Sequence, residues 1–470
     1  MKFVADLHLH SKYSRAVSQA MTLPNMAKWA KYKGISVLAT GDFTHPFWFE
    51  QLKNELEDAG NGLFRLKNSV TASEAKQSQE IASSMTPRND IYFMLSCEVS
   101  SIYSQGGKGR RIHILFFFPS LSAVDKFNKE LLKRRANLRA DGRPIVGIPS
   151  SELARMALSC DDKALIIPAH AWTPWFSVFG SFSGFDSIEE CFGDMAENIY
   201  GVETGLSSDP AMNWQVGDLD KRTILSFSDA HSLPKMGREA TVFEGNEVSY
   251  DCIYNAIKNV SKGPTAEGES RSKERNVSKV AFTIEFYPEE GKYHFTGHRD
   301  CNFSQSPDDS RKDGNICPVC HRPLTVGVMH RVEDLKTSDQ KPVTRDQDGV
   351  KWHYSISNRP PYVSLVPLYE IIAEASGVAP GAKKVEEIYI SLVTSLGSEF
   401  SVLMRAEPSQ IARFSSQKVA DGVVRVRSGN IVVEPGYDGK FGVVKIWSET
   451  TADPVKEDAD QSDAQLNLFA

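Results

Sequence analysis

Short apolar runs and amphipathic stretches alternate along the first half of this chain. The apolar runs are rich in β-branched and aromatic residues, which predicts strands. Residues 23–33 carry apolar side chains at helical spacing and are followed by Gly34, which predicts an amphipathic helix that ends there. The alternation predicts an α/β fold, and the apolar runs occupy residues 2–5, 35–40, 90–95, 113–118, 164–168 and 222–226.

Each of these runs has a metal-binding residue type at one end or shortly after it. The run 2–5 leads into His8 and His10, whose side chains point the same way if the strand continues. A capping Asp or a core His explains any single case, but six cases in one order favour a metal site on the C-terminal rim of a barrel. The residues at the other runs are Asp42, His45, Glu98, His113, His170, Asp229 and His231.

The segments HLHSKYS, GDFTH, SCE, HIL, PAH and SDAH, in this order, resemble the PHP (polymerase and histidinol phosphatase) metallophosphoesterases. With the later segments described below, the whole chain resembles the endonuclease Q family. The resemblance implies a distorted (β/α)7 PHP barrel that holds two or three divalent ions (Zn, Mn or Mg). It also implies hydrolysis of DNA on the 5′ side of deaminated bases (uracil, hypoxanthine, xanthine) and at abasic sites.

Residue by residue, the resemblance implies ligand roles for the histidines and carboxylates at the strand ends. Asp42 and His45 are spaced more widely than in many PHP proteins, which leaves open which of them binds metal. Arg15 stands where many members have a further histidine, which predicts a lost ion or a contact to phosphate. The ions are expected to neutralise charge on the phosphate and to lower the pKa of water. The candidate catalytic residues are Glu98, His170 and Asp229.

A second metal site is predicted after residue 280. The pattern HxxC followed by CxxC supplies four ligands that can close a tetrahedron around a structural zinc. His294 and His321 are alternative ligands, and two unrelated thiol pairs are the structural alternative. The expected zinc ligands are His298, Cys301, Cys317 and Cys320.

Several basic and aromatic residues are candidates for DNA contact. Lys108, Arg110 and Arg111 lie in a Gly-rich loop before His113, although a solvated face is the ordinary explanation. The loop 168–185 is crowded with aromatic side chains, which more often form a lid or a core. A flipped base needs a stacking pocket, however, so this loop is a candidate pocket or wedge. Its candidate residues are Trp172, Trp175 and Phe176.

The C-terminal part suggests a smaller α+β domain. Residues 362–396 show helical patterning, and Lys383 and Lys384 follow a turn that could contact phosphate or could simply join two helices. Residues 423–447 alternate with glycine, which predicts short strands with Arg425 and Arg427 on one face.

The C-terminal tail is acidic and ends in QLNLF, one residue from the last. This peptide resembles the motif by which bacterial proteins bind the replication sliding clamp, although a chance apolar tail is possible. The predicted clamp-binding residues are Gln465, Leu466, Leu468 and Phe469.

These patterns divide the chain into five parts. They are the PHP barrel (1–258), a polar linker (259–279), the zinc-binding segment (280–335), the C-terminal DNA-binding α+β domain (336–450) and the flexible tail (451–470).

Composition narrows the function only slightly. A net charge of −6 taken alone disfavours a nucleic-acid partner, but the distribution of charge over the surface matters more than the total. Seven scattered cysteines argue against a disulfide framework and for a reducing compartment. No run is long enough to span a bilayer and no signal peptide precedes the first strand. We therefore expect a cytoplasmic, nucleoid-associated bacterial monomer that binds damaged DNA and no membrane.

Two other functions remain open. A PHP small-molecule phosphatase would share the barrel, but the long C-terminal half disfavours it. A non-catalytic, clamp-associated DNA-binding protein would have a degenerate metal site, and Arg15 in place of a ligand keeps that alternative open.

Overall fold

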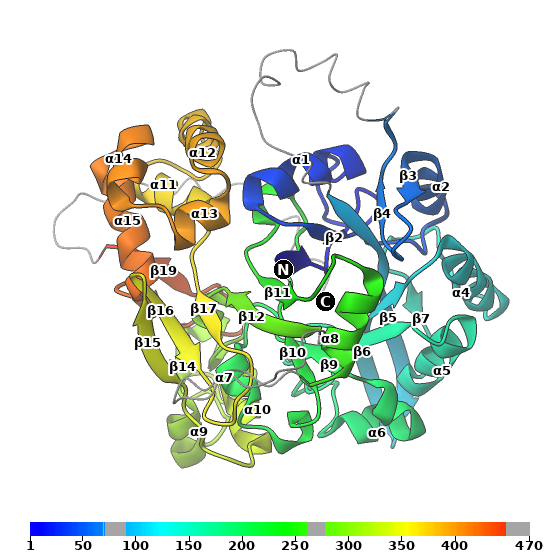
Figure 1. The fold of residues 1–470 in the computed structure, drawn as a ribbon. Helices are drawn as coiled ribbons and strands as arrows, with labels where there is room; N and C mark the ends of the chain where they lie inside the picture. The colour runs from blue at the N-terminus through cyan, green and yellow to red at the C-terminus, as the bar shows by residue number, and fades with distance from the viewer. Residues whose placement is uncertain (69, 71–90, 261–277, 448–470) are drawn as a thin grey trace.

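A thirteen-stranded mixed sheet forms the centre of the computed structural model, which describes residues 1–68, 70, 91–260 and 278–447. Most of the strands that carry or precede candidate ligands belong to this sheet (Figure 1). They are β1 (Lys2–Asp6), β2 (Val37–Ala39), β5 (Tyr92–Gln105), β6 (Lys108–Phe118) and β8 (Leu165–Pro168). β11 (Ala240–Glu244) pairs with β1 and carries no candidate ligand.

Strand direction brings the ends of these strands together. β1 is parallel to β2, and β2 is parallel to β5. β6 is antiparallel to both β5 and β8, so β8 points the same way as β5. The residues that follow β1, β2 and β8 therefore lie at one edge of the sheet.

Two further strands extend this edge. β9 (Gly201–Glu203) and β10 (Thr223–Leu225) form a parallel pair. The N–H of Ala171, just after β8, donates to the carbonyl of Glu203, and Leu9 bridges to Ala230 beyond β10. The mixed α/β class is thus confirmed, whereas closure into a seven-stranded barrel stays a prediction.

Helices cover the outside of this region (Figure 1). The predicted helix 23–33 is confirmed, and it ends at Gly34 with a left-handed φ of 87°. Ser120 caps the N-terminus of α4, because its side chain accepts the N–H of Ala123. The helices are α1 (Leu23–Lys33), α2 (Pro46–Glu55), α4 (Leu121–Lys133), α5 (Ser150–Cys160), α6 (Ile188–Phe192), α7 (Pro210–Asn213) and α8 (Tyr250–Lys258).

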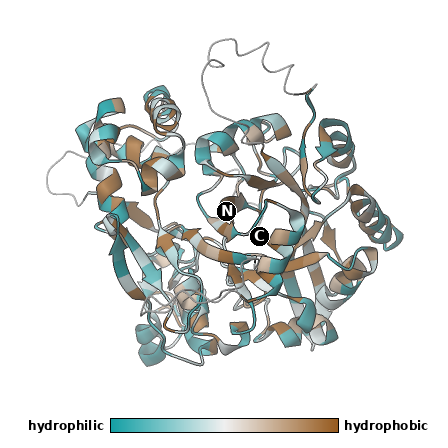
Figure 2. Cartoon of the chain, viewed as in Figure 1, coloured by the Kyte–Doolittle hydropathy of each residue, from teal (hydrophilic) through white to brown (hydrophobic). Residues whose placement is uncertain are grey.

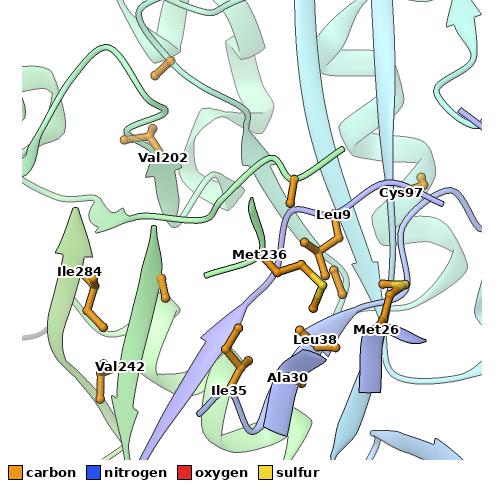
Figure 3. Packing of buried hydrophobic residues seen from close by; sticks show 14 of the residues in the cluster. Leu9, Met26, Ala30, Ile35, Leu38, Cys97, Val202, Met236, Val242 and Ile284 are labelled. Carbon is orange, nitrogen blue, oxygen red and sulfur yellow. The ribbon is translucent and has the colours of Figure 1, made fainter. Parts of the chain in front are cut away.

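Alternate residues of the strands enter two different hydrophobic clusters. In β6, Phe116 and Phe118 belong to the larger cluster, whereas Leu115 and Phe117 belong to the smaller one. This is the period of two expected for a strand that is buried on both faces. Figure 2 shows these strands mainly in brown and the surrounding helices in mixed colours. Figure 3 shows residues of α1 and β2 together with Leu9 in the larger cluster.

The same sheet continues into the second half of the chain. β12 (Lys279–Glu285) pairs with β11 and with β17 (Tyr362–Ser364). The described residues that follow the predicted linker therefore begin inside the sheet of the first half, and the five-part division stays a prediction. Beyond β17 lie β16 (Val350–Tyr354) and β15 (Val343–Gln347), and at the other end β4 (Phe64–Leu66) and β3 (Leu56–Asp58); β7 (Ile145–Val146) pairs with β5.

A helical bundle follows β17. The prediction of strands across 423–447 is wrong for its first part, because residues 423–428 end α15. Val423 and Val426 are buried at helical spacing, and Arg425 and Arg427 do not share a strand face. Two short strands, β18 (Val432–Glu434) and β19 (Val443–Lys445), do form. The bundle comprises α11 (Leu368–Ser376), α12 (Lys383–Leu396), α13 (Glu399–Met404), α14 (Pro408–Phe414) and α15 (Gln417–Ser428).

The segment between β12 and β15 is small and compactly hydrogen-bonded. β13 (Thr296–His298) and β14 (Phe303–Gln305) form a hairpin, and α9 (Pro307–Asp313) and α10 (Val328–Leu335) follow. Across the described ranges, no helix combines the length and apolarity that a bilayer crossing requires.

Candidate metal centre

The structure brings the predicted barrel ligands together in three overlapping groups. Within each group, one potential ligand atom per residue lies within 4.8 Å of the others. Glu98 and His10 each belong to two groups, so the three groups form one continuous cluster. The groups are His8, His10 and Glu98; His10, Asp229 and His231; and Glu98, His113 and His170.

Unsatisfied buried atoms at the middle of the cluster fit a cation. The Nε2 atoms of His8 and His10 and the Oδ1 atom of Asp229 are buried and make no hydrogen bond. His8 Nε2 lies 3.5 Å from Asp229 Oδ1, and His10 Nε2 lies 3.4 Å from the same oxygen. Buried polar atoms are rarely left without partners, and nitrogen and carboxylate ligands suit zinc or manganese. The donor set therefore fits divalent metal ions.

The protonation states of His113, His231 and Glu98 also suit metal binding. Burial lowers the pKa of His113 and of His231 to about 4, so both rings are neutral near neutral pH. Burial opposes ionisation of Glu98, but contacts with His113 and Arg143 outweigh it and hold its pKa well below the usual value. Neutral imidazole and ionised carboxylate are the forms that bind metal. Burial opposes protonation of His8 and His10, but Glu203 beside His8 and Asp42 beside His10 hold the pKa values of these rings well above the usual range, so both rings must release a proton when metal binds.

Two carboxylates behind the cluster hold the histidines in place. Both oxygens of Glu203 contact His8 Nδ1, at 2.9 and 3.0 Å, and Glu203 also accepts the backbone N–H of His170 at 2.7 Å. Asp42 Oδ1 lies 3.0 Å from His10 Nδ1. Carboxylates in this position fix the tautomer and leave Nε2 to face the metal.

Asp42 and His45 lie outside the three groups. The second oxygen of Asp42 accepts the N–H and hydroxyl of Ser11 and the hydroxyl of Ser14. His45 precedes α2, and its ring stacks on Tyr13 at 4.6 Å. The metal-ligand assignment of both residues stays a prediction, and the structure places Asp42 behind His10.

Three residues of the site have left-handed backbones. The φ angles are 50° for Asp42, 30° for His170 and 45° for Asp229. Such conformations are uncommon outside glycine and are kept where the surroundings enforce them. The buried Asp6 helps to do so, because it accepts the N–H and hydroxyl of Ser228, next to Asp229.

Arg143 is a cation in direct contact with the cluster. Its Nη1 donates to Glu98 Oε2 at 3.1 Å. Arg15, which the sequence placed near a phosphate, is 62% exposed and lies 3.6 Å from the carboxylate of Asp141. In the sequence, Arg143 is one of several basic residues on a helix and its exit that could contact phosphate, and nothing in its spacing marks it as the partner of Glu98. Glu203 carried only the weak signal of a strand end.

The basic loop before His113 divides into two kinds of residue. Lys108 and Arg111 are exposed. Arg110 is buried: it donates to the carbonyl of Gly184 and to Glu190, and its guanidinium lies 3.9 Å from the centroid of Phe185. The prediction that Arg110 contacts DNA is therefore wrong, because its side chain is buried and both of its terminal nitrogens donate inside the protein.

The aromatic loop also contains both buried and exposed residues. Trp172 is 1% exposed, stacks on Phe179 at 4.7 Å and donates its Nε1–H to Asn213. It is a core residue, which corrects its assignment as a DNA contact. Trp175 stacks on the exposed Phe182 at 4.7 Å with an interplanar angle of 4°. Phe176 lies 4.9 Å from the ring of His113, at the edge of the cluster.

The four predicted zinc ligands meet as well. One ligand atom from each of His298, Cys301, Cys317 and Cys320 lies within 4.8 Å of the others, and Cys320 Sγ is 3.4 Å from His298 Nδ1. The alternative ligands His294 and His321 are outside this group. Lys383 and Lys384 are exposed at the start of α12. The predicted clamp-binding residues 465–469 lie outside the described residues.

Comparisons with known proteins cover most of the chain. The family of the MJ0043 C-terminal domain matches residues 367–430, the helical bundle. Protein MJ0043 of Methanocaldococcus jannaschii is 30% identical over 282 residues, which are 58% of this chain but only 31% of MJ0043. This chain therefore spans about a third of that relative. Protein YqxK of Bacillus subtilis is 27% identical over 453 residues, which are 94% of this chain and 99% of YqxK.

Two solved structures match along almost the full length. The lesion-specific endonuclease PfuEndoQ from Pyrococcus furiosus is 30% identical with a TM-score of 0.75, and the match covers 95% of both chains. An endonuclease Q in complex with a 27-mer duplex that carries an abasic lesion at the active site is 31% identical with a TM-score of 0.75. That match covers 95% of this chain and 96% of the other. The identity, the coverage and the shared fold together place the chain in the endonuclease Q family.

Proposed function

We propose that the protein is a metal-dependent endonuclease that hydrolyses DNA on the 5′ side of deaminated bases and abasic sites. The observation that carries this proposal is the buried cluster in which His8, His10 and Asp229 point unpaired atoms at one another. Related endonuclease Q has been solved with an abasic duplex at its active site, which supports DNA as the substrate class.

The chain's own residues provide a preorganised site. His8, His10, Glu98, His113, His170, Asp229 and His231 would hold two or three divalent ions. When bound, such ions neutralise charge that develops on the phosphate and acidify water near it. Glu203 and Asp42 keep the rings of His8 and His10 oriented. Arg143 uses one donor on Glu98, and its remaining donors suit a phosphate oxygen.

Lesion recognition is assigned to the exposed part of the aromatic loop. A base cannot be inspected inside the duplex, so it must leave the stack, and damaged or mismatched bases do so at lower cost. Trp175 and Phe182 offer a parallel aromatic stack, and Phe176, the residue after Trp175, lies against the ring of His113. We propose that this surface contacts the everted base.

The remaining predicted residues bind the DNA backbone or the sliding clamp. Lys108, Arg111, Lys383 and Lys384 are exposed cations that suit phosphates. A zinc ion bound by His298, Cys301, Cys317 and Cys320 would stabilise the segment that contains Tyr293. The ring of Tyr293 lies 5.6 Å from the ring of Trp175. The proposed sliding-clamp peptide lies beyond the described residues.

A cleavage assay with defined lesions tests the proposal. Purified protein is incubated with labelled duplexes that carry one uracil, hypoxanthine or abasic site, beside an undamaged duplex and para-nitrophenyl phosphate. We expect one cut 5′ to the lesion with added Mg²⁺, Mn²⁺ or Zn²⁺, and none with Asp229→Ala. Hydrolysis of the small ester alone would point to a phosphatase instead. DNA binding without any cleavage would point to a non-catalytic protein.

A further inference from the structure

We propose that a second aromatic surface, on the His10 side of the metal cluster, stacks an unpaired nucleobase of the DNA substrate. This surface, the Phe47 patch, consists of Lys12, Tyr13, His45, Phe47 and Arg139. The proposal rests on the proposed function, since it names a further contact to the same substrate.

The three rings of the patch form a compact group. Tyr13 and His45 stack at 4.6 Å with an interplanar angle of 20°. Phe47 lies 5.8 Å from His45 and 6.4 Å from Tyr13. Phe47 is 57% exposed in the first turn of α2, whereas the following Trp48 and Phe49 are buried. The core-facing side of α2 is therefore already filled, and Phe47 presents a ring to solvent.

Cations flank the rings on both sides. The ammonium of Lys12 lies 5.4 Å from the centroid of Tyr13, and the guanidinium of Arg139 lies 5.6 Å from that of Phe47. Within the described part of the chain, no ion pair engages Lys12 or Arg139, while the nearby Asp141 pairs with Arg15. Aromatic faces for a base beside cations for its phosphate are the combination by which proteins hold unpaired nucleotides.

The patch is built on the segments that position His10. The backbone N–H of His45 donates to the carbonyl of Asp42, and the N–H of Tyr13 donates to the hydroxyl of Ser11. That hydroxyl donates in turn to the carboxylate of Asp42, which contacts His10. A nucleotide on the patch would thus be fixed relative to the cluster.

The nucleobase that we propose for the Phe47 patch is not the everted lesion, which is assigned to the surface around Trp175. When a lesion leaves the helix, its partner base becomes unpaired, and the neighbouring base on the cut strand loses a stacking face. Both are unpaired or partly unstacked nucleobases, so the patch suits either. The position of a fluorescent base distinguishes these two sources.

Fluorescence of 2-aminopurine tests the inference, because stacking on an aromatic ring quenches its emission. The probe is placed opposite an abasic site in one duplex and next to the site on the cut strand in another. Binding is measured in an Asp229→Ala background, so that the duplex stays intact. We expect quenching with one probe position, and about a tenfold weaker affinity together with loss of that quenching in Phe47→Ala. Phe47→Trp should restore both.

Leu132→Ala is the matched control, since Leu132 is 56% exposed on α4 and belongs to no part of the patch. Unchanged thermal unfolding of Phe47→Ala would show that the fold is intact. Equal affinity and equal quenching in Phe47→Ala and the parent would overturn the inference, as would no quenching with either probe. In both cases, lesion-directed cleavage by the unmodified protein would leave the proposed function standing.

Discussion

Glu203 is the residue on which the geometry of the cluster depends most directly. Its two oxygens reach His8 Nδ1 and the backbone N–H of His170, which belong to different strand ends. One buried carboxylate thereby fixes the orientation of one candidate ligand and the backbone of another. An amide is uncharged and has a single acceptor oxygen, so its NH2 group would oppose one of these two donors.

Glu203→Gln should therefore weaken metal binding. We expect a loss of about 10- to 100-fold in affinity, the usual effect of removing a carboxylate behind a ligating histidine. Calorimetric titration of the metal-free protein with Mn²⁺ or Zn²⁺ would measure it, with Glu244→Gln on the surface of β11 as the control. An affinity equal to that of the parent would show that Glu203 does not position His8.

Substitutions of the two tryptophans in the aromatic loop should have different effects, one on the free energy of unfolding and the other on DNA binding. Trp172→Ala removes a buried ring and should cost about 3–5 kcal/mol in the free energy of unfolding. Trp175→Ala removes a partly exposed ring and should cost much less while weakening binding to lesion-bearing DNA. Urea unfolding and binding titrations of the two variants would measure this. A destabilised Trp175→Ala beside a stable Trp172→Ala would contradict the assignment.

Single site residues could be predicted from the sequence where their own neighbours in the chain form a recognisable pattern. His8 and His10 are visible because they follow a strand at a spacing of two. Glu203 and Arg143 are not visible in this way, because Glu203 acts on a residue 195 positions away and Arg143 resembles its solvated neighbours. Trp172 and Arg110 were misassigned because composition does not reveal burial.

Among the structural elements, α1 joins the metal-site region to the helical bundle. Lys33, at the end of α1, is buried and lies 2.7 Å from Glu399 of α13. Lys33 also donates to the carbonyl of Pro234, in the segment that follows His231. Glu399 accepts the hydroxyl of Tyr389 at 2.7 Å. The bundle is thereby tied to the loop that carries two candidate ligands.

Breaking this ion pair should destabilise the protein strongly. Lys33→Met leaves the Glu399 carboxylate buried without its cation, which costs about 3–5 kcal/mol. Chemical denaturation would measure the loss. The double variant Lys33→Met, Glu399→Gln should recover much of it, because no unpaired charge remains. If the double variant is as unstable as the single variant, the charge is not the cause.

The pairing of β11 with β12 buries two carboxyl groups, Glu239 and Glu285, whose mutual repulsion adds to the effect of burial. Burial raises the pKa of Glu285 to about 8, from 4.5 in the unfolded chain. Between these values the folded state holds a proton that the unfolded state has released. The stability from this group is therefore complete below the unfolded pKa and is lost as the pH rises through the folded pKa.

Glu285→Gln should flatten that decline, because an amide stays neutral. Thermal unfolding midpoints between about pH 5 and about pH 9 would show a smaller fall in the variant than in the parent. Glu244→Gln, on the surface of β11, serves as the control. Identical pH profiles for the parent and Glu285→Gln would mean that Glu285 ionises normally in the folded state.

Most elements were predictable where their pattern was strong. The helix 23–33 combines helical spacing with a C-terminal glycine, and both appear in the structure. α15 was misread because valines and glycines suggest strands, whereas the burial of Val419, Val423 and Val426 follows a helical period. The continuation of one sheet through β12 and β17 could not be predicted, since it depends on pairings between distant segments.

For the molecule as a whole, one sheet links the two halves of the chain and the bundle packs back onto the first half. Trp29 of α1 lies 5.8 Å from Tyr369 and 5.9 Å from Tyr389. The metal cluster, the aromatic surface of Trp175, Phe176 and Phe182, and the Phe47 patch are thus attached to one connected framework. A duplex held on this framework would meet the cluster between two aromatic surfaces, which is how the fold would combine cleavage with selection of unpaired bases.

Metal content measured together with cleavage tests the central claim most directly. The protein is stripped with a chelator, reloaded stepwise, and assayed on an abasic duplex while bound metal is counted by mass spectrometry. We predict that cleavage appears only as metal binds beyond the one zinc that we propose for His298 and the three cysteines. Asp229→Ala should keep that zinc and lose both the additional metal and the cleavage. Full cleavage by protein that holds only that zinc would contradict the claim.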